Sequence, residues 1–103
     1  MSQVLNTLEE VEAAFEAAFA LPYEERRFEA VANKRSARPD VHAFVVLSEL
    51  VPGTGDMVAA AEHDEIFLDV RPADLVGRIT AEGVADLSRC GVNYDGEGLR
   101  MFA

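Results

Sequence analysis

The stretch Ile66-Phe67-Leu68-Asp69-Val70 alternates between two sets of side chains, which is the two-residue period of a β-strand with one face more buried than the other. Residues 57–61, Met-Val-Ala-Ala-Ala, offer a partner strand through the turn Glu62-His63-Asp64, although these alanines would also suit a helical turn. A hairpin needs no crossover connection. This stretch therefore indicates an antiparallel sheet.

A helix and a second hairpin are predicted on the C-terminal side of this stretch. Residues 71–75 open a short helical segment, and Thr80 caps another that runs to about Cys90, where Gly91 suits a left-handed helix stop. Residues 92–94 and 99–102 are typical of short strands joined by the glycine-containing turn 95–98.

Helices are predicted on the N-terminal side. From about Leu8 to Leu21, apolar and acidic side chains each recur at three- and four-residue steps, and Thr7 with Glu10 fits a capping box. Pro22 ends this helix and starts a second one, which extends to about Lys34. The side chains expected in the core are Leu8, Val11, Phe15, Ala18 and Phe19 from the first helix and Tyr23, Phe28, Val31 and Ala32 from the second.

Residues 39–51 are apolar almost all round, so periodicity alone does not separate a buried helix from a buried strand. Pro39 suits a first helical position, and Pro52-Gly53-Thr54-Gly55 is a firm stop, so we predict a short buried helix. The order of helices, hairpin, helix and hairpin predicts an α+β fold. We expect one domain over residues 1–103, with helices mainly on one face of about four antiparallel strands.

The formal net charge is −10, from 19 acidic and nine basic side chains. Such a charge repels a polyanion and argues against direct nucleic-acid binding. Apolar residues nowhere form the roughly 18-residue run of a membrane-spanning helix, and the first residues lack the features of a secretory signal. With Cys90 as the single cysteine, we expect a cytoplasmic protein with one reduced thiol.

The basic residues gather in one segment. We call Arg26, Arg27, Lys34, Arg35 and Arg38 the basic cluster, and Glu9, Glu12 and Glu16 the acidic stripe. The cluster could bind an acidic partner or a phosphate backbone, or it could bind the acidic stripe of the same chain or of a second copy. The net charge favours the second interpretation, so a homodimer is one expectation.

Residues 39–103 resemble small uncharacterised proteins of bacteriophages and prophages. The similarity rests on residues 51–57, on residues 61–66 and on the ending Arg89-Cys90-Gly91-Val92-Asn93-Tyr94-Asp95 with Met101-Phe102. It implies a phage or prophage accessory protein, and it brings no known activity or catalytic residues.

Three sets of residues are candidates for chemical sites. His63, Asp64 and Asp69, with His42 as a further candidate, could hold a divalent metal, but no paired ligand spacing is present, so a solvated turn is the favoured interpretation. Cys90 lies at a predicted helix C-terminus, where the helix dipole disfavours a thiolate, and is expected to be a small buried residue. His42 is expected to be a hydrogen-bonded core or rim histidine.

The leading functional hypothesis is a non-enzymatic protein-binding or accessory protein without a cofactor. Phe67 and Phe102 lie on the strand faces opposite the predicted core, where they would form an apolar interaction patch if no helix covered them. The alternatives are an acidic mimic of nucleic acid that inhibits a host DNA-binding protein, and a small metal-dependent hydrolase that uses His63, Asp64 and Asp69.

Overall fold

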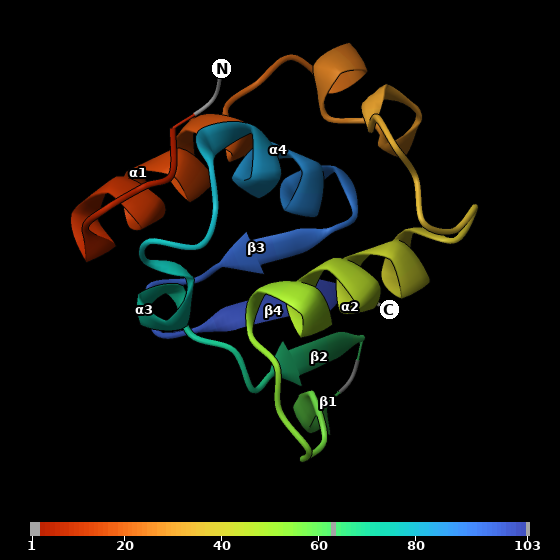
Figure 1. The fold of residues 1–103 in the computed structure, drawn as a ribbon. Coiled ribbons are helices and arrows are strands. Elements are labelled where there is room, and N and C mark those ends of the chain that lie inside the picture. The colour runs from red at the N-terminus through yellow and green to blue at the C-terminus, as the bar shows by residue number, and fades with distance from the viewer. Residues whose placement is uncertain (1–2, 63, 103) are drawn as a thin grey trace.

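The computed structural model describes residues 3–62 and 64–102, with Phe102 described by its backbone alone. It is an α+β fold in which helices precede a four-stranded antiparallel sheet of order β1-β2-β4-β3 (Figure 1). The strands are β1 (Val58–Glu62), β2 (Glu65–Leu68), β3 (Val92–Tyr94) and β4 (Leu99–Phe102). The predicted fold class, the two hairpins and the strand assignment of residues 58–61 are thus confirmed.

Helix α1 (Leu8–Phe19) begins as predicted. The Glu10 N–H donates to the Thr7 hydroxyl over 3.1 Å, and the Glu10 carboxylate in turn accepts from the Asn6 N–H over 3.2 Å. Its buried side chains are Val11, Phe15 and Ala18. The prediction was wrong for the two ends of the apolar stripe, because Leu8 is 43% and Phe19 62% exposed.

The second predicted helix, over residues 22–34, is not continuous. The segment forms two 3₁₀ turns, η1 (Tyr23–Glu25) and η2 (Phe28–Ala30), which extended residues separate. Neither turn contains a buried residue, and Val31 follows as the buried apolar anchor of the segment. A helix survives in water mainly through a buried face. Tyr23, which is 71% exposed, and the exposed Ala32 do not supply one.

Helix α2 (Pro39–Leu50) confirms the helical interpretation of its apolar block. Pro39 occupies the first turn, where its missing N–H leaves no bond unmade. The helix lies against one face of the sheet, in front of β2 and β4 in Figure 1. It buries His42, Ala43 and Leu47. Further apolar residues of the helix are half-buried or, like Val41, exposed, so the sequence shows no clear polar stripe.

The C-terminal elements also follow the prediction. Helix α3 spans Pro72–Leu75, and α4 spans Ala81–Arg89 with its first turn capped by the Gly83 N–H donating to the Thr80 hydroxyl over 3.0 Å. Gly91 has a φ of 95°, the left-handed geometry that ends α4. Helices α1 and α4 pack side by side over β3 (Figure 1).

The core lies between the helices and one face of the sheet. It draws on every helix and on β2, β3 and β4, and its most deeply buried side chains are Val11, Leu47, Leu75, Val84, Leu87, Val92 and Leu99. Among the described residues, no helix is long and apolar enough to cross a membrane.

Candidate binding groove beside helix α1

The candidate metal ligands do not lie together. His63 lies outside the described residues, while Asp64 and Asp69 are exposed at the β1–β2 hairpin. Within residues 3–62 and 64–102, no three His, Cys, Asp or Glu side chains are placed to hold a metal ion together.

His42 is a hydrogen-bonded core histidine, as expected. It is 4% exposed, and its Nδ1 accepts from the Arg35 backbone N–H over 3.0 Å. Its ring meets that of Phe28 edge to face, with 6.0 Å between the ring centroids. The side chain therefore holds the segment before α2 against that helix, and its position is structural.

Cys90 is buried at the end of α4. Burial raises the pKa of its thiol to about 11, and the nearby Asp86 carboxylate adds to this rise. A thiol that stays protonated at neutral pH is a poor nucleophile, so the expectation of a small buried side chain is confirmed.

The basic cluster forms its ion pairs within its own neighbourhood. Arg27 lies 3.5 Å from Glu29, and Arg35 lies 2.8 Å from Glu49 on α2. The Lys34 ammonium donates to the carbonyls of Val31 and Glu29 over 3.0 and 3.3 Å. Arg38 is exposed. Arg27, Lys34 and Arg35 thus use local acceptors, whereas the Arg26 Nε is buried without a hydrogen-bond partner among the described residues. The predicted pairing with the acidic stripe of the same chain is not among the contacts of these side chains.

The acidic stripe divides into two kinds of residue. Glu9 and Glu16 are exposed on α1, whereas Glu12 is half-buried and accepts a hydrogen bond from the Tyr94 hydroxyl, with 2.5 Å between the two oxygens. This bond to Glu12 raises the pKa of Tyr94 above its ordinary value. It also ties α1 to β3, so part of the stripe has a structural use that its spacing did not indicate.

Of the two predicted patch residues, Phe67 lies on the strand face opposite the core. It belongs to β2, pairs with Arg100 of β4 and is half-buried, while the side chain of Phe102 lies outside what the structure describes. Beside Phe67, the Arg100 guanidinium lies 2.8 Å from the Glu65 carboxylate. An ion pair thus occupies the centre of this face, which is more polar than the sequence suggested.

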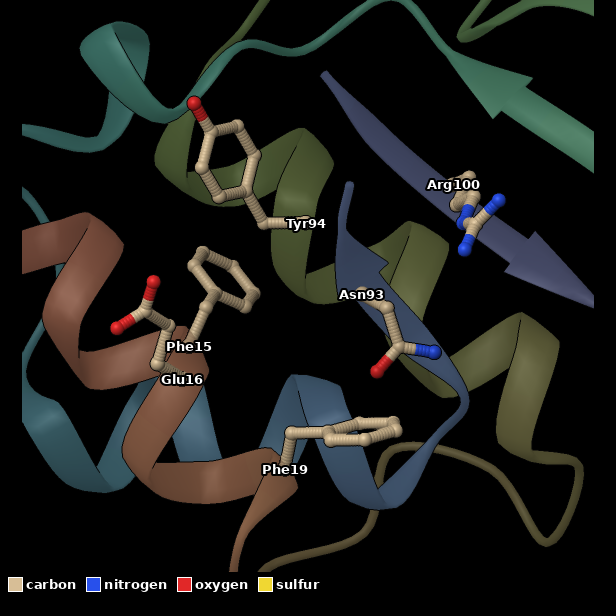
Figure 2. Close-up of a pocket in the computed structure, with 6 residues that line it drawn as sticks. All are labelled: Phe15, Glu16, Phe19, Asn93, Tyr94 and Arg100. Atoms are coloured by element: carbon tan, nitrogen blue, oxygen red, sulfur yellow. The ribbon is translucent and has the colours of Figure 1, made fainter. Parts of the chain in front are cut away.

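A groove of about 420 Å³ continues this face toward α1. Figure 2 shows Phe15 and Tyr94 on one side, Phe19 below, Arg100 on the other side and α2 behind the strands. We call it the α1 groove. Its lining is Phe15, Glu16, Phe19, Asn93, Tyr94 and Arg100.

A second hollow of about 210 Å³ lies next to the α1 groove and shares Phe19 and Asn93 with it. Tyr23, Arg26 and Ser88 complete the lining of this second hollow. Here the Arg26 guanidinium lies over the Phe19 ring, 5.8 Å from the centroid. Two largely exposed aromatic rings, Phe19 and Tyr23, therefore border two adjacent hollows.

Sequence reasoning missed this groove because it assigned Phe19 and Tyr23 to the core. One usable signal was the alternation of Leu99, Arg100 and Met101, which puts Arg100 on the face opposite two buried side chains. The approach of β3 to the C-terminal half of α1 has no local signature.

No protein-family model matches this sequence, and comparisons with curated proteins and with solved structures found no significant match.

Proposed function

We propose that this chain is a non-enzymatic protein-binding protein and that the α1 groove is its contact surface. The observation that carries the proposal is the exposure of two large aromatic rings beside the groove, Phe19 at 62% and Tyr23 at 71%. Aromatic residues that border a pocket are frequent anchors of protein interfaces.

The surroundings of these rings support the same function. Asn93, the Arg100–Glu65 ion pair and Glu16 provide a polar rim around an apolar floor, which is the usual division of a protein interface. The groove is partly open to solvent, so a side chain or an extended segment can enter it.

Photo-crosslinking in a lysate of the source organism tests this proposal. With p-benzoylphenylalanine at position 23 we expect a discrete protein adduct, which Phe19→Ser should abolish because the neighbouring anchor is lost. The same label at position 58 on β1, at the opposite edge of the sheet, is the matched control. Equal adducts at both positions, or an adduct that persists in Phe19→Ser, would contradict the assignment of the groove.

A homodimer is a separate outcome of the same proposal. Light scattering distinguishes it, since an adduct of twice the chain mass together with a dimeric scattering mass would identify a second copy as the partner. The resemblance to phage and prophage proteins remains a prediction, and it does not cover α1, which supplies half of the residues that line the groove.

A further inference from the structure

We propose that the α1 groove binds a cationic side chain, a lysine or an arginine, that the protein partner carries. This inference rests on the proposed function and names the chemistry of the group that enters the groove. It follows from three features of the described residues: the aromatic lining, the distribution of charge, and a contact that the chain makes with its own arginine.

The lining favours an organic cation. Phe15, Phe19 and Tyr94 line the groove. Phe15 is buried, while the Tyr94 ring is half-buried and the Phe19 ring is largely exposed. The faces of exposed aromatic rings attract ammonium and guanidinium groups. The Tyr94 ring is held in place because its hydroxyl is bonded to Glu12, so this ring does not have to be ordered when the ligand enters.

The charges of the groove point in the same direction. Arg100 has the Glu65 carboxylate 2.8 Å away, so its positive charge is largely compensated. Glu16 is exposed, and no ion pair ties it to another described side chain. With a net charge of −10 on the whole chain, the field around the groove attracts cations.

The chain itself provides a precedent at the end of the groove. Arg26 lies over the Phe19 ring at 5.8 Å, within the range of a cation–π contact. This contact shows that the aromatic surface accepts a guanidinium when one is placed near it. The Tyr94 ring, which is half-buried in the same groove, can receive a second cation from the partner.

A second copy of the chain fits this site less well than a basic partner does. Three of the five basic-cluster residues, Arg27, Lys34 and Arg35, are engaged with acceptors of their own chain, and they would have to leave them to enter a neighbour's groove. Of the other two, Arg26 already lies over Phe19 of its own chain, and Arg38 is exposed. Two copies would also bring two net charges of −10 together. The partner is therefore a basic protein segment.

A titration followed by ¹H–¹⁵N NMR tests the inference with a defined probe. The ligand is the peptide acetyl-Ala-Arg-Ala-Arg-Ala-amide, and its control contains citrulline, which has the shape of arginine without the charge. We expect the arginine peptide to shift the amide signals of Phe19, Asn93 and Tyr94. The citrulline peptide should bind about 3- to 30-fold more weakly, as expected for the loss of a cation–π contact.

Two pairs of variants locate the effect. Glu16→Gln should weaken the arginine peptide about threefold or more, whereas Glu62→Gln, which removes the same charge from exposed β1, should leave the affinity unchanged. Phe19→Leu keeps an apolar side chain but removes the aromatic face, and it should weaken the arginine peptide more than the citrulline peptide. Because Phe19 is largely exposed, this variant should fold normally.

Three results would overturn the inference. They are equal binding of the two peptides, equal weakening by Glu16→Gln and Glu62→Gln, and no groove signals shifted by about 10 mM peptide, which corresponds to an affinity too weak to be specific. None of these results affects the crosslink at position 23, which tests the protein-binding function separately. Failure of that crosslink together with specific binding of arginine would instead reject the protein-binding function and keep a cation site.

Discussion

Residues 21–38 and residues 81–102 differ in how well local sequence predicts their conformation. Both follow a helix end or turn, and both contain apolar residues at helical spacing. Only the second region folds as its pattern predicts, into α4, β3 and β4. The first forms two 3₁₀ turns with one buried apolar anchor, Val31.

The difference lies in what each region buries. Val84, Ala85 and Leu87 place one face of α4 in the core, and Thr80 caps its start. Residues 21–38 are instead held by hydrogen bonds between their backbone and side chains of other elements. Arg89 donates to the Glu25 carbonyl over 2.7 Å, and His42 accepts from the Arg35 N–H. Helical spacing therefore needs a surface to bury before it produces a helix.

The largest expected effect is the loss of stability when a buried or half-buried side chain is removed from each of the two regions. Leu87→Ala should lower the free energy of unfolding by about 2–5 kcal/mol, because Leu87 is 1% exposed and its loss leaves a cavity. Phe28→Ala in the half-buried turn η2 should cost less than about 2 kcal/mol. Urea denaturation of both variants measures the difference. Equal losses would mean that residues 21–38 contribute to the core as much as α4 does.

The next effect concerns the attachment between the regions. Arg89→Met should cost about 1.5–3 kcal/mol, since its guanidinium also bonds to Glu82 and Asp86 and its side chain is only 12% exposed. Amide hydrogen exchange should accelerate mainly in residues 21–30. Arg38→Met is the matched control, because Arg38 is exposed. Unchanged exchange in residues 21–30 would show that the segment is held by other contacts.

Two positions with positive φ give a smaller contrast. Gly91 ends α4 with a φ of 95°, so Gly91→Ala should destabilise the chain by about 1–2 kcal/mol through backbone strain. Asn33 has a φ of 54° in the exposed segment, and Asn33→Gly should change stability by less than about 0.5 kcal/mol. Thermal unfolding of both variants measures these changes in stability. A loss of stability in Asn33→Gly as large as the one in Gly91→Ala would contradict the prediction.

The smallest effect is expected at acid pH in the β3–β4 turn. Asp95 accepts hydrogen bonds from the Gly98 and Glu97 N–H groups, and these bonds lower its pKa below the ordinary value of 3.8. A lowered folded-state pKa means that this stabilisation is present above pH 3.8 and is lost as the pH falls toward the lower value.

In Asp95→Asn the free energy of unfolding should therefore fall less steeply below pH 4 than in the unaltered chain, while other carboxylates titrate equally in both. Urea denaturation at a series of pH values measures the two slopes. Identical slopes would show that Asp95 has the same pKa in the folded and unfolded chain.

Most of the fold was predictable because its signals are local. Thr7 and Thr80 cap their helices through bonds within three residues, and Gly91 terminates α4 by its own backbone geometry. The alternation around Leu68 likewise needs only the strand period. Such features depend on residues that are close together in the sequence. The sequence therefore predicts α1, α2, α4 and both hairpins.

The groove was not predictable for the same reason. Glu12 and Tyr94 are 82 residues apart, yet their hydrogen bond joins α1 to β3. Arg89 and Glu25 are 64 residues apart, and their hydrogen bond joins the end of α4 to η1, the turn that carries Tyr23. No spacing rule connects such positions, because their proximity depends on how the helices pack over the sheet.

The α+β class, the antiparallel hairpins, the helix caps and the strongly acidic charge follow from the amino-acid sequence alone, since these depend on contacts between near neighbours or on composition. Which apolar side chains stay exposed, and which carboxylates bond within the chain, depends on how the helices pack over the sheet. Burial is a property of the packed chain: Phe15 and Phe19 lie one turn apart on α1 and both line the groove, yet Phe15 is buried in the core and Phe19 is largely exposed.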